Sequence, residues 1–145
     1  MEFTRTVTTD APTAEVFRYL ADFTTTTEWE PATVTTTRVS GDGGVGTTYR
    51  NVTRFMGRDT ELTYVVDELV EGSRIRLRGH NKALDATDTM TVRALPSGGT
   101  EVTYQAAFAM KGLARLLAPA FRPALRRLVD NAQKGLGAAL DRLAA

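Results

Sequence analysis

The chain has 145 residues, 42% of them hydrophobic and 24% charged, with a formal net charge of +1. This composition is typical of one soluble globular domain, here residues 1–145, and the interspersed charges argue against a nucleic-acid binder. The chain has no cysteine and one histidine, which excludes disulfides, thiol nucleophiles and multi-histidine metal sites, so we expect no metal and no cofactor. No stretch reaches the roughly 20 apolar residues of a membrane span, and no apolar signal core opens the chain. We therefore predict a cytoplasmic protein.

The first thirty residues predict a strand followed by short helices. Residues 2–9 alternate apolar and polar side chains and are rich in threonine, a pattern typical of a half-buried strand. The segment Asp10-Ala11-Pro12 indicates a helix start, because proline suits the first helical turn. That helix is expected to end near Asp22. A second short helix or turn is expected over residues 24–30, where Pro31 stops it.

Strand signals then follow one another with short links. Glycine-rich or proline-containing turns at residues 41–44, 57–58, 71–73 and 96–99 separate them. Short links imply antiparallel neighbours. The six strands are predicted at residues 34–40, 46–56, 59–70, 74–80, 83–95 and 100–110.

The last third of the chain predicts one long amphipathic helix. Its apolar residues recur every three or four positions: Leu113, Leu117, Phe121, Leu125, Leu128, Ala132, Leu136, Ala139, Leu140 and Leu143. Such a stripe is buried by lying across the concave face of a sheet, and a strongly curved sheet leaves a cavity beneath it. Pro119 and Pro123 predict a separate turn over residues 113–118 and a helix from about residue 120 to 143. Gly135 and Gly137 indicate either close packing or room for a ligand.

Several segments, taken with this order of elements, resemble the SRPBCC superfamily, also described as START-like or birch-pollen-allergen-like. The segments are Asp10-Ala11-Pro12, Ala21-Asp22-Phe23, Glu28-Trp29-Glu30-Pro31, Val45-Gly46-Thr47, Phe55-Met56-Gly57-Arg58, Leu84-Asp85-Ala86-Thr87-Asp88 and Lys111-Gly112-Leu113. Within the superfamily the chain looks like the bacterial polyketide cyclase/dehydrase-type branch. The resemblance implies an α+β helix-grip fold, in which a curved seven-stranded antiparallel sheet wraps around the C-terminal helix, with a deep apolar cavity between them. Fold analogy does not supply a reaction.

The candidate site follows from side-chain alternation along the strands. The inward faces are mostly apolar but carry tyrosines, Asn51 and Asp88, and a buried polar group requires a partner. Asp88 is the candidate general acid or base, and its alternative roles are to cap a turn or to lie on the outer face. His80 falls on the outer face, and Trp29 either covers the cavity mouth or fills a junction. The predicted ligand-binding residues are Tyr49, Asn51, Tyr64, Leu77, Met90, Val92, Tyr104, Phe108, Leu128 and Ala132.

Three functions remain open from the sequence. The first is binding, with possible transport, of a small hydrophobic ligand such as a lipid, polyketide or aromatic metabolite. The second is a cyclase-, aromatase- or dehydratase-like enzyme that uses Asp88 with a tyrosine, since such chemistry needs a proton donor and acceptor beside the substrate. The third is an interaction module, which a large exposed apolar patch would support. The basic residues of the helix favour a solvated face over membrane docking, and we expect a monomer or homodimer.

Overall fold

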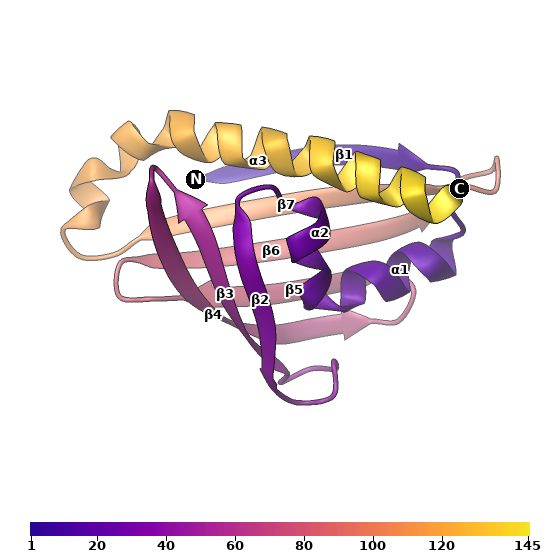
Figure 1. Cartoon of the computed structure of the whole chain (residues 1–145), viewed down its shortest axis with the longest axis horizontal. Coiled ribbons are helices and arrows are strands. Elements are labelled where there is room, and N and C mark those ends of the chain that lie inside the picture. Colours follow the sequence, from indigo (N-terminus) through magenta and orange to yellow (C-terminus); the bar gives the residue numbers. More distant parts are fainter.

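The computed structural model describes all 145 residues, Met1–Ala145. Seven antiparallel strands form one sheet, in the spatial order β1-β7-β6-β5-β4-β3-β2. The predicted seven-stranded helix-grip architecture is therefore confirmed (Figure 1). The strands are β1 Glu2–Thr9, β2 Thr33–Ser40, β3 Thr48–Phe55, β4 Arg58–Val70, β5 Arg74–His80, β6 Leu84–Ala94 and β7 Thr100–Met110. The helices are α1 Thr13–Ala21, the 3-10 turn η1 Phe23–Thr25, α2 Thr26–Trp29 and α3 Ala114–Ala144.

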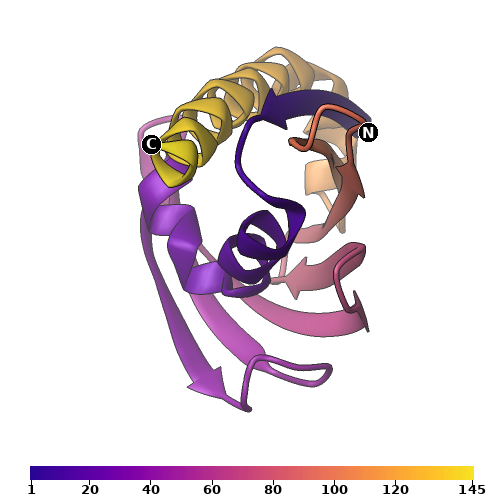
Figure 2. The ribbon, with the colours of Figure 1, turned by 90° about the vertical axis from the view of Figure 1, so that its right-hand side faces the viewer.

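The sheet curves around its concave face. Seen end-on, the sheet forms an open curve, and α3 lies in the gap between the two edge strands β1 and β2 (Figure 2). The short helices that follow β1 lie inside the curve and complete the cover. This arrangement places the core between α3, the short helices and the concave face.

Polar contacts fasten α3 along β1. Arg5 forms an ion pair with Asp130, with 2.8 Å between Nε and Oδ1. The amide of Gln133 donates a hydrogen bond to the carbonyl of Thr6, and the hydroxyl of Thr9 donates one to the carbonyl of Leu140. An edge strand has unpaired backbone groups, and this helix protects β1 from pairing with another chain.

The helix begins earlier than the sequence predicted. A single helix runs from Ala114 to Ala144 with Pro119 and Pro123 inside it, so the separate turn over residues 113–118 is not formed. The first turn is tightened by hydrogen bonds from Arg115 N–H to Gly112 O and from Leu116 N–H to Leu113 O. Proline removes one hydrogen bond and bends a helix, and the first turns of α3 bend away from the rest (Figure 1).

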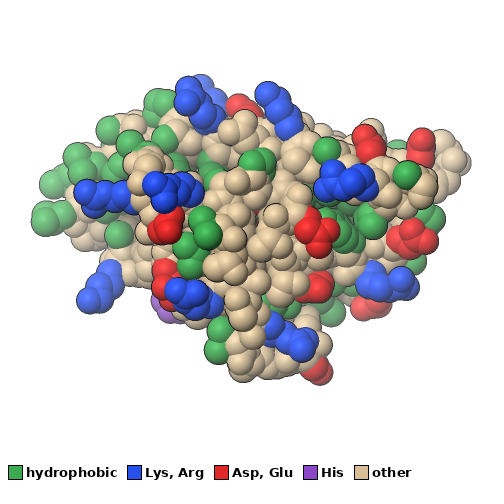
Figure 3. All heavy atoms as spheres, viewed as in Figure 1, with side chains coloured by type: hydrophobic (Ala, Val, Ile, Leu, Met, Phe, Trp, Pro, Cys, Tyr) green, Lys and Arg blue, Asp and Glu red, His purple; other side chains and the backbone are tan.

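The apolar stripe is buried only along the later part of the helix. Leu113 and Leu117 are 84% and 56% exposed, because the first turns extend beyond the sheet. Leu116 and Met56 are also exposed, and apolar side chains (green) gather on the left of Figure 3. The buried positions of α3 are Leu125, Val129, Ala132, Leu136, Ala139 and Leu140. No helix of the structure has the length and apolar character that crossing a membrane requires.

Candidate functional site

A cavity of about 90 Å³ lies between α3, the η1–α2 segment and the concave face of the sheet. Its inner end is closed by buried side chains that include Phe23, Trp29 and Ala132. The other end opens beside the β3–β4 hairpin and the first part of α3. The half-buried apolar side chains at this mouth are Phe55, Leu84, Phe108, Met110 and Leu128.

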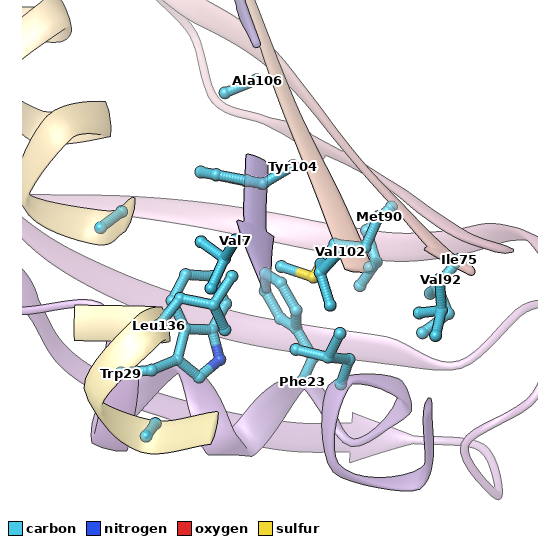
Figure 4. Close-up of a cluster of buried hydrophobic side chains, with 14 of the residues drawn as sticks. Val7, Phe23, Trp29, Ile75, Met90, Val92, Val102, Tyr104, Ala106 and Leu136 are labelled. Carbon is cyan, nitrogen blue, oxygen red and sulfur yellow. The ribbon is translucent and has the colours of Figure 1, made fainter. Parts of the chain in front are cut away.

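Aromatic rings build the inner end of the cavity. The Trp29 ring meets Tyr104 edge-on, with 5.8 Å between the ring centroids. The Phe23 ring lies 4.8 Å from that of Tyr64. Figure 4 shows that Phe23, Trp29 and Tyr104 come from different elements, and that Trp29 lies beside Leu136 of α3. Aromatic pairs in these geometries stabilise the fold beyond the apolar area they bury.

Gly79 positions the Tyr64 ring. Tyr64 of β4 stands opposite Gly79 of β5 in the register of the sheet. A Cβ atom on Gly79 would lie 2.6 Å from Cε1 of Tyr64, so the tyrosine ring lies over the bare backbone of β5. This lets the ring extend toward β6, which carries Asp88 two residues beyond Ala86, the partner of Gly79.

Asp88 lies on the concave face and lines the cavity. On β7, the residue directly opposite is Ala106, and Tyr104 is its diagonal neighbour on the same face. Asp88 is half-buried, and its carboxyl group makes no hydrogen bond or ion pair within the fold. Burial, and secondarily the charge of Glu30, raise the pKa of Asp88 to about 7.

Glu30 is a second carboxyl group in the same cavity, and the sequence analysis missed it. The backbone N–H of Ala32 donates to its Oε1 at 3.1 Å, and the hydroxyl of Thr33 donates to its Oε2 at 2.9 Å. Burial raises the pKa of Glu30, while these hydrogen bonds lower it and offset part of the effect. The sequence analysis named Asp88 alone as the candidate general acid or base, and the structure adds Glu30 as a second carboxyl group in the same cavity. Strand alternation could not find Glu30, because it lies in the turn between α2 and β2.

The tyrosine hydroxyls at the site have no hydrogen-bond partners in the fold. Burial raises the pKa values of Tyr64 and Tyr104 well above the ordinary value, and the charge of Asp88 adds to this. Both groups are therefore neutral hydroxyls at physiological pH. Each offers one donor and one acceptor to whatever occupies the cavity.

Asn51 differs from the tyrosines because its side-chain amide already has hydrogen-bond partners within the fold. Its amide donates to the hydroxyl of Thr36 at 2.9 Å and accepts from the hydroxyl of Thr53 at 2.8 Å. Thr36 in turn pairs with Thr26 of α2 at 2.7 Å. This chain of hydrogen bonds ties β2 and β3 to the short helix and forms one wall of the cavity.

Trp29 leaves a polar atom without a partner. Its side chain is 3% exposed, yet its indole Nε1 makes no hydrogen bond. Trp29 also lines the cavity, so it both fills the junction with α3 and closes the inner end of the site. A buried N–H without an acceptor costs about 1–3 kcal/mol, which a water or ligand oxygen would relieve.

The structure brings some of the residues predicted for the site together and separates others. Those that line the cavity are Asn51, Tyr64, Asp88, Tyr104, Phe108, Leu128 and Ala132. Leu77, Met90 and Val92 are instead buried in the core, where Figure 4 shows Met90 and Val92 grouped with Ile75 and Val102. Strand parity predicted that these residues face inward, but not that α1 and the short helices pack over that part of the concave face.

Tyr49 borders a different hollow. This hollow, of about 910 Å³, lies between α1 and the loops after β2 and β4, and it is lined by charged side chains of both signs, including Arg18, Arg38 and Asp22. Burial raises the pKa of Tyr49, and the Phe23 backbone N–H partly offsets this. An apolar ligand fits the smaller cavity better, because its walls are mostly hydrophobic.

Three further residues singled out in the sequence lie outside the cavity. His80 is exposed at the end of β5. A Cβ on Gly135 would lie 1.9 Å from the carbonyl oxygen of Trp29, whereas one on Gly137 would lie 3.7 Å from Cγ1 of Val7. Gly135 therefore serves close packing between α3 and α2. No group of three or more acidic or histidine side chains is arranged to hold a metal ion.

A helix-grip fold with an apolar cavity beneath its long helix is the architecture of a START-like protein. The model of the family described as polyketide cyclase / dehydrase and lipid transport matches residues 1–145. The chain belongs to this family, as the resemblance predicted. A search of curated proteins found no relative by sequence.

Solved structures share the fold at low sequence identity. The Zhui aromatase/cyclase from Streptomyces sp. R1128 superposes with a TM-score of 0.83 at 16% identity, covering 100% of this chain and 96% of that one. The protein TTHA0849 from Thermus thermophilus gives 0.80 at 18% identity, covering 97% of both chains. A START superfamily protein from Mycobacterium smegmatis gives 0.66 at 13% identity, covering 93% of this chain and 98% of that one. At these identities the likeness concerns the fold alone.

Proposed function

We propose that this protein binds a small apolar molecule in the cavity beneath α3. One observation carries the proposal: the mostly hydrophobic walls enclose polar groups that the fold leaves without partners, namely Asp88, Tyr64, Tyr104 and the indole N–H of Trp29. Ligand sites commonly combine apolar walls with a few such groups. In this proposal Phe108 and Leu128 contact the apolar body of the ligand at the mouth, Ala132 contacts its head group at the inner end, and Asn51 lines the wall.

The volume of the cavity limits which part of a ligand can lie at its inner end. An engineered cavity of about 150 Å³ binds benzene, so about 90 Å³ accepts only a smaller group at the inner end. The apolar side chains at the mouth, Phe55, Phe108, Met110 and Leu128, continue the hydrophobic surface outward. A ligand with a small polar head inside and an apolar body toward the mouth fits this shape.

Trp29 is the only tryptophan of the chain, so its indole N–H signal in a nitrogen-15 spectrum reports directly on the cavity. We expect benzyl alcohol, a neutral probe, to shift this signal saturably. Ala132→Leu adds three carbons to a buried side chain that borders the cavity, so it should abolish the shift at a smaller cost in stability than the same change away from the cavity. Ala139→Leu, on the same helix but in the packed core, should destabilise by about 1–3 kcal/mol. Unchanged binding by Ala132→Leu would contradict the site, and native mass spectrometry of freshly purified protein tests for a bound natural ligand.

A second function, acid–base catalysis on a polyketide-like substrate, is favoured by one feature. Two carboxyl groups, Asp88 and Glu30, line the same cavity, and the pKa of Asp88 lies near neutrality. A group with such a pKa serves well as a general acid or base at physiological pH. If the protein is an enzyme, Asp88→Asn should abolish turnover of a β-keto substrate and leave its binding nearly intact. If it is a carrier, the same variant changes affinity and no turnover exists to lose.

A further inference from the structure

The charges of the cavity indicate what kind of head group it accepts. Its walls carry two carboxyl groups, Glu30 and Asp88, and no lysine, arginine or histidine. Arginines of the neighbouring strands β3 and β5 lie on the other face, where they pair with surface carboxylates, as Arg50 does with Glu61 and Arg76 with Asp67. An anionic head group would thus add a third negative charge to a site with no compensating cation. Fatty acids and phosphates are therefore poor candidates.

The aromatic rings complete a setting suited to a cation. Phe23, Trp29, Tyr64 and Tyr104 surround the inner end of the cavity, and two of these rings pack against each other at 5.8 Å. Aromatic faces attract ammonium groups, and this attraction is strongest where water is excluded. Carboxylates beside the rings add charge-assisted hydrogen bonds.

Two unfilled hydrogen-bonding groups indicate that the site is completed by a ligand. The Asp88 carboxyl makes no hydrogen bond within the fold, and the indole N–H of Trp29 has no acceptor although the side chain is almost fully buried. Glu30, by contrast, is held in place by Ala32 and Thr33. Asp88 is thus the free acceptor for a ligand donor, and Trp29 the free donor for an oxygen of the ligand or a water beside it.

We propose that the ligand is a small apolar amine, bound as its ammonium ion with the cationic head against Asp88 and Glu30 and the apolar body toward the mouth. This rests on the proposed ligand-binding function and narrows it to one chemical class. The ammonium donates to Asp88 while the rings of Tyr64 and Tyr104 lie beside it. A neutral carbonyl compound would instead accept a hydrogen bond from the protonated carboxyl of Asp88, so the two classes respond to pH in opposite directions.

The groups that face Asp88 determine this pH response. They are Glu30 from the turn after α2, Tyr64 from β4 and Tyr104 from β7, while α3 contributes only apolar side chains to the cavity. Both tyrosines stay neutral below pH 9, because burial raises their pKa values. Between pH 6 and 8 the main change is ionisation of Asp88, whose pKa is about 7.

The test compares benzylamine, benzyl alcohol and benzoate, which share one ring and differ in the head group, by titrating the Trp29 signal at pH 6 and 8. We expect benzylamine to bind about tenfold more tightly than benzyl alcohol at pH 8, and benzoate least. The affinity for benzylamine should rise about tenfold from pH 6 to 8. This is the ratio of the ionised fractions at these two pH values for a group with a pKa of about 7. Asp88→Asn should remove both the preference and the pH dependence.

Asp85→Asn is the matched control, because Asp85 lies on the same strand but pairs with Lys111 at the exposed end. Asp85→Asn should leave unchanged both the preference for benzylamine over benzyl alcohol and the pH dependence of benzylamine binding. If benzyl alcohol binds as well as benzylamine, or benzoate binds best, the amine proposal is wrong while the ligand-binding function stands. If no probe shifts the Trp29 signal, the cavity is not a ligand site and both proposals fail.

Discussion

Asp67 and Asp88 stand on opposite faces of the same sheet and have opposite environments. On the convex face, Asp67 accepts hydrogen bonds from Arg76, at 2.8 Å, and from Arg78. Partial burial alone would raise the pKa of Asp67, but these two arginines outweigh it and lower the pKa. On the concave face, Asp88 has no cation and its pKa is raised to about 7. One face uses its charges for pairing within the fold, and the other leaves a charge available to a ligand.

The convex face also shows why its ion pairs say little about function. Its other pairs include Arg50 with Glu61 and Arg93 with Glu101, and their arginines are about half or more exposed. Exposed pairs contribute little to stability, because water and salt screen them. A buried carboxyl without a partner costs much more, so its retention in the cavity is the stronger indication of a role.

The largest expected effect is a pH dependence of stability that Asp88 imposes. Its native pKa of about 7 exceeds the value of about 3.9 in an unfolded chain. As pH rises, the unfolded state therefore releases its proton first, and stability is lost between about pH 4 and pH 7. The loss in the wild type is up to about 4 kcal/mol. Asp88→Asn should abolish this dependence, as measured by urea unfolding across pH 4 to 8.

Asp67→Asn provides the opposite control on the convex face. Because the native pKa of Asp67 is lowered, its contribution is present above the unfolded value and is lost as pH falls. The variant should lose a little stability at neutral pH and become less sensitive to acid. If both aspartates shift stability in the same direction with pH, the contrast between the two faces is wrong.

The next largest effect concerns the packing of α3 against α2, which shields the concave face of the sheet from water. Gly135→Ala would place a methyl group 1.9 Å from the Trp29 carbonyl oxygen, so α3 must move away from α2. We expect a loss of about 3 kcal/mol and partial exposure of Asp88. Gly137→Ala meets only an ordinary contact with Val7 at 3.7 Å and should be neutral or gain up to about 1 kcal/mol. Equal unfolding midpoints for the two variants would contradict this packing.

The sequence predicted the fold well because its signals are local. Period-two alternation, glycine turns and the apolar stripe of the helix each act over a few residues, and all seven strands lie where they were expected. The start of α3 was missed because proline usually interrupts a helix, whereas α3 here continues through Pro119 and Pro123 and bends in its first turns. Leu117 was expected to be buried, but burial depends on where the sheet ends.

The site was less predictable because it depends on contacts between distant segments. Alternation placed Asp88, Tyr64 and Tyr104 on the concave face, where they are found. It could not separate them from Met90 and Val92, since only the position of the short helices decides which part of that face is packed. Glu30 lies in a turn, where no periodic pattern reports on direction. The roles of these residues toward a ligand remain predictions.

The smallest expected effect on stability comes from removing a hydroxyl that the fold does not use. Tyr104→Phe deletes a group with no hydrogen-bond partner in the structure, so unfolding should change by less than about 0.5 kcal/mol. Thr100→Val is the matched contrast: its buried hydroxyl donates to Ala11 O at 2.8 Å and pairs with Thr13 at 3.0 Å. Its loss leaves a buried carbonyl unpaired and should cost about 1–3 kcal/mol.

If the Tyr104 hydroxyl serves the ligand, Tyr104→Phe should nonetheless weaken binding of the benzyl probes, whereas Thr100→Val should not. If Tyr104→Phe instead lowers stability and leaves binding unchanged, the Tyr104 hydroxyl belongs to the packed core and does not serve the ligand.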